Sequence, residues 1–583
     1  MTTSSPWSIQ EIIGPNTNQL LDPALNRIWF WQKDADGRCL AFNKRGAIHH
    51  FVKIFLPYWG FYKYRVGSDG GYLIIQKNRQ RVRIIGHDGD KGSAVEIFEW
   101  FQDQVPFLKA VLGHGKKNSL IPQGFDEEVF AAVDLFTSRT LQYLPKLKVV
   151  EYEDSQGKTR KGELLPLQDT PTEAFLPFEN GIIHLTANKD PAMVPWSQIP
   201  ANRFIWDREV RNYRIKIQDH PSGAFWEFLK HLALEEQEGN WKPNLSQQDC
   251  LVSAVGYLCH NYQLPDKRPC VIFYDRTNAW KSGGNGKSLL CTALQHVRPV
   301  HEISGKHLKK GDNQFAWAGY TPEKRVVVIQ DIKAEFQFDS LYNQIEDAFT
   351  VEEKGKNKVT IPREMAPKIA ITTNHTVDNQ GWSDARRQHL VPISTYYGSM
   401  NRFHGKNVKD ILGQWLYLDW SEDQWNDFYN VIIHCLQFYL DQGLSRFDDE
   451  VYQDRLMLAA TSGNEELLQT LKDFINDVVS NHDGETTRSA LHAALNSEEL
   501  ESLNQSWSGN WQTRCFKRVA ESMGYQINAG RREGRWQQKI NGKTEDCFKL
   551  TSMQSPVSHS SASKPQDGMN SILKFFTRSG LSK

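Results

Sequence analysis

Short, nearly continuous apolar runs recur through the middle of the chain, and each ends in a polar residue or a glycine-containing loop. The runs at 270–274, 326–329 and 368–373 are rich in β-branched residues and have the length of buried strands. Residues 288–295 follow the first run and carry apolar residues at helical spacing. The pattern therefore predicts strands that alternate with helices in this part of the chain.

The pattern before this region is different. Two strand-like stretches, 51–66 and 71–86, flank a turn-prone glycine sequence, and 93–104 has the spacing of an amphipathic helix. Residues 151–170 are polar and predict either a linker or a long hairpin. We therefore expect an α+β domain of unknown role over 1–165, and then a helical or collar segment over 166–262.

From about residue 400 the pattern turns helical, most clearly at 424–441. Helical spacing at 467–479, 487–495 and 514–523, followed by a strand pair within 525–550, predicts a winged-helix-like unit. The expected division is a nucleotide-binding core over 263–400, a helical lid region over 401–463, a winged-helix-like DNA-binding domain over 464–550, and a disordered tail over 551–583.

Glycines and a Gly-Lys-Ser sequence join the strand at 270–274 to the helix that follows. Glycines let backbone N–H groups turn toward phosphate oxygens, and the helix start adds its positive end. In such a loop Lys287 would reach the β and γ phosphates of ATP, and the Ser288 hydroxyl would bind Mg²⁺. Lys281 departs from the usual pattern, which has a glycine there. The residues assigned to the nucleotide are Gly283, Gly284, Asn285, Gly286, Lys287, Ser288 and Leu289.

The next two strands end in polar residues that suit the same site. Asp331 follows the strand at 326–329 and would hold Mg²⁺ together with Ser288. Asn374 follows the strand at 368–373 and can orient the attacking water or contact the γ-phosphate. Arg386 and Arg387 could complete the site of a neighbouring subunit, or they could form an ordinary surface pair.

Composition limits the choice of function. The chain has 583 residues, 69 Lys and Arg, and 69 Asp and Glu, so nucleic-acid binding would need local basic patches. No apolar run approaches the ~20 residues that span a bilayer, and the N-terminus lacks a signal-peptide core, so we expect a cytoplasmic protein without a membrane partner. Eight cysteines without a C-x-x-C pair argue against a zinc ribbon and against a disulfide framework.

Three local features are candidates for nucleic-acid chemistry. Four basic residues alternate along an expected strand: Lys77, Arg79, Arg81 and Arg83. They form either a DNA or RNA surface or a solvated sheet face, and the solvated face is the commoner environment of exposed charge. Asp34 and Asp36 could hold a metal ion in a primase, although their sequence also suits a hairpin turn. Between 514 and 543, eight Lys and Arg face only two Glu, which favours DNA binding there.

A basic hairpin is predicted between the second and third strands of the core. The β-prone stretches 349–351 and 359–361 flank a polar tip. Lysines on such a tip can neutralise phosphates without reading base sequence. The candidate DNA-binding residues are Lys354, Lys356, Asn357 and Lys358.

The ordered motifs GGNGKS, VVVIQD, KIAITTN and DARR resemble those of superfamily 3 helicases of the AAA+ class, and more narrowly the primase–helicase proteins of phages, plasmids and poxviruses. The sequence FENGIIHL upstream extends the resemblance, which covers roughly residues 170–445. Gln330 stands where many members of that family have a second acid, which leaves open which residue activates water; Glu335 is a distant candidate.

The resemblance implies an α/β AAA+ P-loop ATPase core with the α+β N-terminal region and the C-terminal winged-helix-like domain attached. It implies an ATP- and Mg²⁺-dependent replicative DNA helicase of a phage, plasmid or mobile element, which forms a ring, by analogy a hexamer, on single-stranded or forked DNA. In that family the hairpin lies in the central pore, Asn374 senses the γ-phosphate, and Arg386 or Arg387 reaches the next subunit's site. The alternative is an ATP-switched DNA-binding initiator or recruitment protein with weak hydrolysis.

The tail contains an apolar triplet in the sequence MNSILKFF, which resembles a sliding-clamp-binding peptide. Ile572, Phe575 and Phe576 match its apolar positions, whereas Met569 replaces the usual glutamine. One turn of 3₁₀ helix would put the three side chains on one side. We expect them to bind a sliding clamp, unless they fold back on the winged-helix-like unit.

Overall fold

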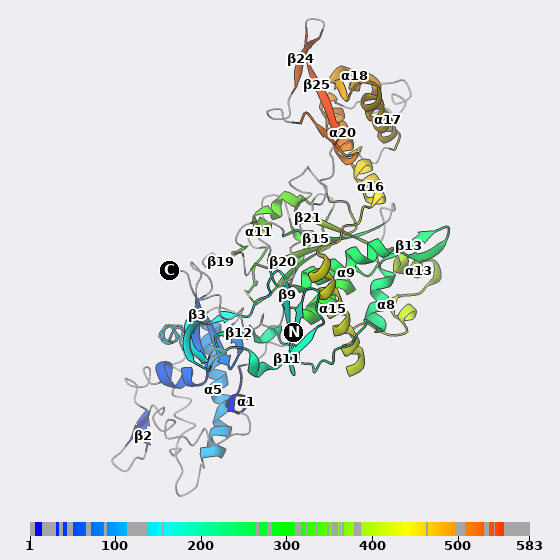
Figure 1. Cartoon of the computed structure of the whole chain (residues 1–583). Coiled ribbons are helices and arrows are strands. Elements are labelled where there is room, and N and C mark those ends of the chain that lie inside the picture. Colours follow the sequence, from blue (N-terminus) through cyan, green and yellow to red (C-terminus); the bar gives the residue numbers. More distant parts are fainter. Residues whose placement is uncertain are drawn as a thin grey trace.

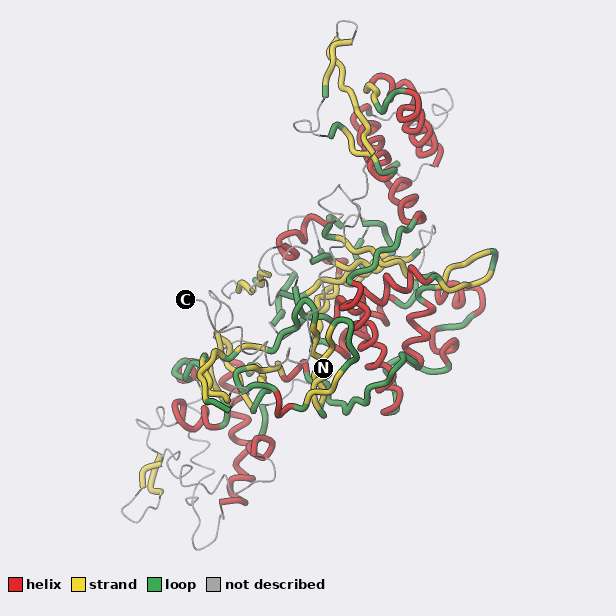
Figure 2. The backbone as a smooth tube through the Cα atoms, viewed as in Figure 1, coloured by secondary structure: helices red, strands yellow, loops and turns green. Residues whose placement is uncertain are grey.

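The computed structural model describes 6–13, 31–33, 39–42, 51–65, 72–86, 90–112, 137–153, 157–263, 268–276, 283–308, 316–321, 323–333, 336–346, 349–352, 359–361, 363, 366–377, 386–461, 465–495, 508–529, 536–540 and 543–552. These residues form an N-terminal sheet with a long helix, a central parallel sheet covered by helices, and a separate C-terminal unit of helices and strands (Figures 1 and 2).

The N-terminal sheet has the order β3-β4-β5-β12-β8. Helix α5 (Asp90–Leu112) packs against it, with the Phe61 and Trp100 rings 4.8 Å apart. Strand β12 pairs in parallel with both β5 and β8, so residues on both sides of the expected boundary at 165/166 share one sheet. The strands are β3 (Phe61–Arg65), β4 (Tyr72–Asn78), β5 (Arg81–Ile84), β8 (Leu165–Pro166) and β12 (Arg203–Trp206).

The expected strand over 51–58 is wrong. This stretch forms the helical turns η2 (Phe51–Phe55) and α4 (Leu56–Tyr58). Its buried residues Val52, Phe55, Leu56 and Trp59 are spaced by three and four positions, which is the period of a helix and not the period of two that a strand requires.

The segment after the N-terminal sheet is mixed, and it is not purely helical as expected. The hairpin alternative for 151–170 is confirmed, because β6 (Val149–Glu153) pairs antiparallel with β7 (Thr159–Glu163). A three-stranded sheet follows, and then the helices α8 and α9 with a short strand pair between them. The elements are β9 (Glu173–Phe178), β10 (Gly181–Thr186), β11 (Ala192–Val194), α8 (Gly223–His231), β13 (Leu234–Gln237), β14 (Asn240–Pro243) and α9 (Leu245–Cys259).

The central sheet is parallel throughout and confirms the predicted α/β core. Its order is β16-β17-β20-β15-β21, so the three strands that precede the glycine loop, Asp331 and Asn374 are direct neighbours, with β20 in the middle. The helix after the glycine loop is α10 (Lys287–Val297). The strands are β15 (Cys270–Asp275), β16 (Val300–Ser304), β17 (Val326–Gln330), β20 (Lys368–Thr373) and β21 (Gln388–Ile393).

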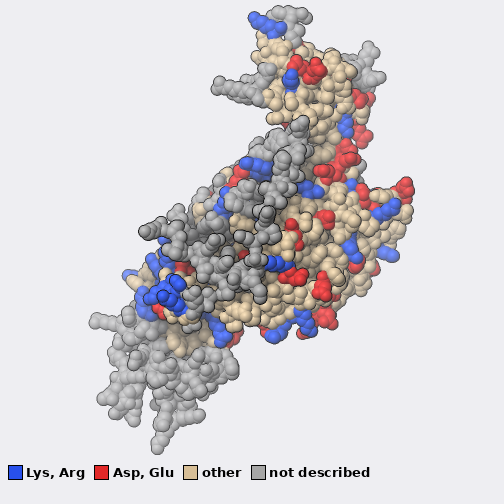
Figure 3. All heavy atoms as spheres, viewed as in Figure 1, with Lys and Arg blue, Asp and Glu red and all other residues tan. Residues whose placement is uncertain are grey.

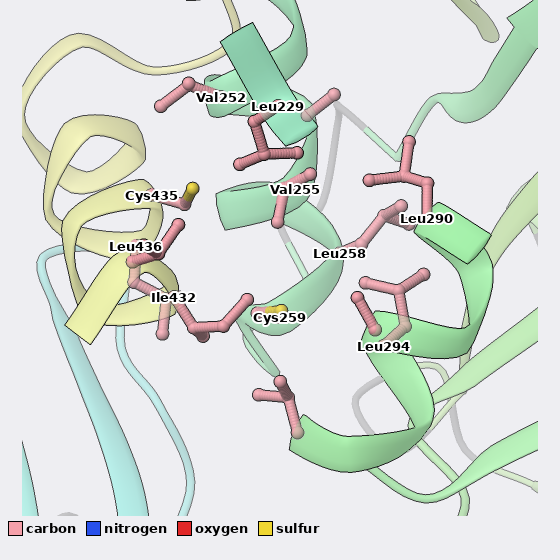
Figure 4. Packing of buried hydrophobic residues seen from close by; sticks show 14 of the residues in the cluster. Leu229, Val252, Val255, Leu258, Cys259, Leu290, Leu294, Ile432, Cys435 and Leu436 are labelled. Atoms are coloured by element: carbon pink, nitrogen blue, oxygen red, sulfur yellow. The ribbon is translucent and has the colours of Figure 1, made fainter. Parts of the chain in front are cut away.

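Both faces of this sheet are buried, which explains why its strands are continuously apolar. On β15, Val271 and Phe273 face the helical layer of α9, α10 and α15 (Glu422–Gln442), whereas Ile272 faces the opposite layer. Helices α9 and α15 approach closely at Gly256, where an added Cβ would lie 2.0 Å from the carbonyl oxygen of Cys435. Figure 4 shows these helices packing through leucine, isoleucine, valine and cysteine side chains.

The opposite layer includes the base of the predicted hairpin. Strands β18 (Phe349–Val351) and β19 (Val359–Ile361) pair antiparallel, which confirms the hairpin. Phe349 packs against Trp317 and Tyr320. The base of the hairpin is therefore anchored in the core on the sheet face opposite α9, α10 and α15. The tip residues Lys354, Lys356, Asn357 and Lys358 lie outside the described part of the chain.

The helices expected toward the C-terminus are confirmed, but three strands instead of a pair lie at 525–552, where the last one pairs with both of the others. A core of its own, with Leu471 and Phe516 at its centre, holds the C-terminal unit together. Within the described residues, no helix combines the length and apolar composition that crossing a bilayer requires. The elements are α13 (Tyr396–His404), α14 (Val408–Leu412), α16 (Glu450–Ala460), α17 (Glu465–Asn481), β22 (Glu485–Thr487), α18 (Arg488–Leu495), α20 (Gly509–Ser522), β23 (Tyr525–Ile527), β24 (Gln537–Ile540) and β25 (Lys543–Ser552).

Candidate nucleotide-binding site

The glycine loop has the backbone shape that phosphate binding requires. Gly284 and Gly286 adopt φ values of 75° and 96°, which favour glycine, and Gly286 caps the N-terminus of α10. Asn285 is buried, and its Oδ1 accepts a hydrogen bond of 3.0 Å from the Gly398 amide. Gly283, Gly284 and Ser288 are exposed, whereas Leu289 is partly buried beside the core. The loop therefore has a fixed end at α10 and an open face, while Lys281 lies outside the described residues.

Lys287 joins the ends of two neighbouring strands. Its Nζ contacts Asp275 Oδ1 and donates a 2.8 Å hydrogen bond to Asn374 Oδ1. Asp275 ends β15 and is fully buried, and Asn374 directly follows β20. Burial lowers the pKa of Lys287, whereas the Asp275 carboxylate opposes that shift. Lys287 and Asn374, which were assigned separately to one site, are thus in direct contact, and Asp275 lies in the same cluster.

Asp331 directly follows β17 and has a strained backbone conformation. Its φ of 56° is uncommon for a residue with a side chain, and its amide donates a 3.0 Å hydrogen bond to Thr372 Oγ1. Its carboxylate is 55% exposed and lies 3.9 Å from Lys306 Nζ. Asp331 and Ser288 therefore offer the hard oxygen ligands that Mg²⁺ prefers.

No group of three or more His, Cys, Asp and Glu that could hold a metal ion occurs among the described residues. A nucleotide-bound Mg²⁺ does not need one, because phosphate oxygens and water complete its coordination. Asp331 and Ser288 thus fit Mg²⁺ only together with a nucleotide.

Gln330 is held in place by two polar neighbours. Its Oε1 accepts from Thr372 Oγ1 at 3.1 Å, and its Nε2 donates to Glu302 Oε1 at 3.3 Å. Glu302 lies on the adjacent strand β16, and it is exposed. A carboxylate therefore lies beside the position that lacks the second acid. The other candidate, Glu335, lies outside the described residues.

The two candidate arginines have different surroundings, although both contact Glu346. Arg387 is 7% exposed, contacts Glu346 Oε2 and stacks its guanidinium 4.1 Å from the Tyr342 ring centroid. Arg386 is 64% exposed and donates a 2.7 Å hydrogen bond to Glu346 Oε1. These contacts with Glu346 and Tyr342 do not involve Lys287, Asp275 and Asn374, which together form the Lys287 cluster.

Arg455 lies beside the nucleotide motifs, although it belongs to none of them. It is buried on α16, more than 160 residues after Lys287 in the chain, and donates to the carbonyl oxygens of Asp275 and Asn374, each at 2.8 Å. Asp275 follows the apolar run 270–274 as Asp331 and Asn374 follow theirs, so the same strand-end pattern could have indicated it, whereas no local pattern indicates Arg455.

The four basic residues expected to share one face of a strand, Lys77, Arg79, Arg81 and Arg83, do not lie along one strand. The chain turns at Arg79, which has φ of 52°, so Lys77 lies on β4 and Arg81 on β5. Arg81 and Arg83 both pair with the nearly buried carboxylate of Asp207. The interpretation that these residues alternate along one strand is therefore wrong, and the charge of Arg81 and Arg83 serves an internal contact.

Other cations gather at the edge of the same sheet, around the exposed ring of Tyr72. Lys146 Nζ and Lys63 Nζ lie 4.7 and 5.4 Å from its centroid. A hydrogen bond from Lys146 lowers the pKa of Tyr72, and the nearby charges of Arg65 and Lys63 act in the same direction. Figure 3 shows Lys and Arg side chains gathered over this part of the face in view.

The basic region of the C-terminal unit is partly described. Arg514 and Arg518 are exposed one turn apart on α20, and Lys517 Nζ lies 5.8 Å from the Phe548 ring centroid. Lys539 lies on β24. The described residues do not include the other cations of this region, at 531, 532 and 535. They also do not include Asp34 and Asp36, or the tail residues Ile572, Phe575 and Phe576.

A cavity of about 580 Å³ lies elsewhere, between the loop at 166–171 and residues 261–263, with Arg203 and Arg363 on its walls. It is lined by none of the residues that surround Lys287. Volume alone would favour it as a ligand site. The open phosphate loop and the converging polar groups make the Lys287 cluster the better candidate.

Comparisons with known proteins give weak structural likenesses. No family model matches the sequence, and no curated protein matches it. The apo structure of the NrS-1 C-terminal region aligns over 85% of this chain and 98% of its own, with 14% identity and a TM-score of 0.34. Drosophila ORC bound to DNA aligns over 58% of this chain and 91% of its own, with 10% identity and a TM-score of 0.16. A Thermotoga maritima RuvB mutant aligns over 52% of this chain and 92% of its own, with 11% identity and a TM-score of 0.20. These scores are low, so the functional argument rests on the chain's own contacts.

Proposed function

We propose that this protein is an ATP-dependent DNA helicase of the superfamily 3 type, from a phage, plasmid or other mobile element. One observation carries the proposal: Lys287 of the glycine loop lies between Asp275 and Asn374, at the carboxyl ends of adjacent parallel strands. Ligands of open parallel sheets bind at that edge. Asp331 follows the next strand, so the residues of all three motifs converge.

Each residue has a defined task in this proposal. The glycine-loop amides and Lys287 hold the β and γ phosphates, while Ser288 and Asp331 hold Mg²⁺. Asn374 orients the attacking water, which Glu302 can help to polarise through Gln330. Bound ATP supplies the phosphoanhydride bond whose hydrolysis drives movement.

The proposal extends to assembly and to DNA. A hexameric ring would let the exposed Arg386 reach a neighbour's site, whereas the buried Arg387 would support the loop from within. The anchored hairpin would carry Lys354, Lys356, Asn357 and Lys358 to one DNA strand, and the winged-helix-like unit would bind DNA through α20. The tail triplet Ile572, Phe575 and Phe576 would bind a sliding clamp.

A second function is an ATP-switched initiator or recruitment protein. The observation that favours it is Gln330, an amide where a second acid would speed hydrolysis. Such a protein would bind ATP tightly, hydrolyse it slowly and unwind little DNA.

The test is a Lys287→Ala variant, assayed for ATP turnover with and without single-stranded DNA and for unwinding of a forked duplex. We expect loss of both activities, because the charge opposite the phosphates is gone. Lys242→Ala, at an exposed lysine of β14, is the matched control and should behave as wild type. Near-normal unwinding by Lys287→Ala would refute the proposal, and tight ATP binding without unwinding by the wild type would favour the initiator.

A further inference from the structure

The nucleotide site is tied to the C-terminal unit by one helix, α16. The side chain of Arg455 is buried against the carboxyl edge of the central sheet. One terminal nitrogen donates to the carbonyl of Asp275 and the other to the carbonyl of Asn374, both at 2.8 Å. The planar fork of a guanidinium can bridge two acceptors in this way, whereas the point charge of a lysine cannot hold both in one geometry.

These two carbonyls belong to the residues whose side chains hold Lys287. A movement of Lys287 toward a phosphate would change what the Asp275 and Asn374 side chains contact. Because side chain and carbonyl share one peptide backbone, such a rearrangement reaches the hydrogen bonds that Arg455 makes. Two routes thus link Arg455 to Lys287, one through Asp275 and the other through Asn374, and each route passes through a single residue.

The first half of α16 makes further contacts with the same edge. The Tyr452 hydroxyl accepts from the Val377 amide at 3.0 Å and donates to the Val377 carbonyl at 3.3 Å. Its ring lies 4.4 Å from that of Tyr274, the penultimate residue of β15. Asp449, just before the helix, accepts from the Tyr274 hydroxyl at 2.5 Å. This half is therefore fixed to the ends of β15 and β20.

The second half of α16 belongs to the C-terminal unit. Met457 is buried in the core that contains Leu471 and Phe516. Lys472 on α17 donates to Asp454 at 3.1 Å, which adds a polar contact. Figure 1 shows α16 between the central sheet and the helices α17 and α20. A short continuous helix fixed at both ends transmits a rotation or a shift as a rigid body.

We propose that α16 couples the nucleotide state to the C-terminal unit, with Arg455 as the positioning residue that reads the backbone of Asp275 and Asn374. This rests on the proposed function, because it requires that a nucleotide engages Lys287. When Lys287 turns toward the phosphates, α16 follows the two carbonyls and moves the C-terminal core with it. Coupling is reciprocal, so DNA bound by the C-terminal unit changes nucleotide affinity by the same factor.

The experiment is hydrogen exchange on the full-length protein, alone, with Mg²⁺ and ADP, and with Mg²⁺ and a non-hydrolysable ATP analogue. Nucleotide binding is measured separately on the same samples. In the wild type we expect nucleotide to change exchange rates in α17 and α20 by about fivefold or more, the lower range of allosteric coupling. A change in α17 and α20 that disappears in a variant of Arg455 that still binds nucleotide reports transmission and not local protection.

Arg455→Lys should bind nucleotide and lose the change in α17 and α20. Gln453→Ala, at an exposed residue of the same helix, is the matched control and should keep it. Tyr452→Phe, which removes the hydroxyl that contacts Val377, should reduce the change. It replaces Arg455→Lys as the test variant if Arg455→Lys does not fold. An unaltered response in Arg455→Lys, or in Tyr452→Phe where it stands in, would overturn the coupling.

The outcomes separate this proposal from the function on which it rests. A wild type that binds nucleotide but shows no change in α17 and α20 overturns the coupling and leaves the ATPase proposal intact. A wild type that binds no nucleotide overturns both.

Discussion

At the scale of single residues, the nucleotide site depends on buried partners for its charged groups. Lys287 is 7% exposed, and desolvation opposes its charge. Asp275 and Asn374 offset that cost by contacting the ammonium.

Experiment should distinguish the roles of the two arginines of the DARR motif, Arg386 and Arg387. Arg386→Ala should change the free energy of unfolding by less than about 0.5 kcal/mol, because the side chain is mostly exposed, yet it should reduce ATP turnover by ~10³ if it reaches a neighbour's γ-phosphate. Arg387→Ala should instead destabilise the protein by about 1–3 kcal/mol, since it loses Glu346 and the Tyr342 ring.

Thermal melts of both variants measure the change in stability, and ATPase assays measure the change in ATP turnover. Mixing Arg386→Ala with Lys287→Ala should restore part of the activity, because a composite site forms only between subunits. Absence of any rescue would mean that Arg386 does not act across an interface.

At the scale of elements, helix α20 is amphipathic in a way that suits DNA. Val519 and Phe516 are buried in the C-terminal core, and Arg514 and Arg518 lie on the exposed face one turn apart. The N-cap Ser508 accepts from the Trp511 amide at 3.3 Å and fixes the start of the helix. The basic face therefore has a defined orientation on the unit.

Replacing Arg514 and Arg518 with alanine should weaken duplex DNA binding without unfolding the unit. The slope of log affinity against log salt should become shallower by about 0.9 for each phosphate that the protein no longer neutralises. Binding titrations at several salt concentrations measure it, with Lys242→Ala as the control. An unchanged slope would show that this face of α20 does not contact DNA.

At the scale of the whole molecule, several histidines are buried in neutral form. Burial lowers the pKa of His389 and of His260 to about 4 each, below their ordinary value of 6.5. In the unfolded chain these rings take up a proton near pH 6.5, whereas in the folded protein they resist it until about pH 4. Their contribution to stability is therefore complete above pH 6.5 and is lost as the pH falls from 6.5 toward 4.

The expected result is a melting temperature that falls between pH 7.5 and 5.5. Below pH 6.5 the loss approaches about 1.4 kcal/mol per pH unit for each such histidine. His389→Gln should show a smaller fall than the wild type over the same range, measured by calorimetry in matched buffers. Equal falls for the two proteins would mean that His389 titrates normally in the folded state.

The sequence by itself determined the local parts of this protein. Continuous apolar runs predicted β15, β17 and β20 because both faces of a parallel sheet are buried, and the glycines before Lys287 predicted the phosphate loop because only glycine adopts its backbone angles freely. Helical spacing predicted α10, α15, α17 and α20. The prediction failed at 51–58, where helical spacing was interpreted as a strand.

Tertiary structure decided what no local pattern encodes. Asp275, Asn374 and Arg455 meet only because β15 and β20 are neighbours and α16 returns to their ends. The sequence placed Arg81 and Arg83 on one strand face with Lys77 and Arg79, but the chain turns at Arg79 and brings Arg81 and Arg83 to Asp207. The physical reason is the same in each case: periodicity and propensity act over a few residues, whereas the partner that satisfies a buried charge can come from any part of the chain.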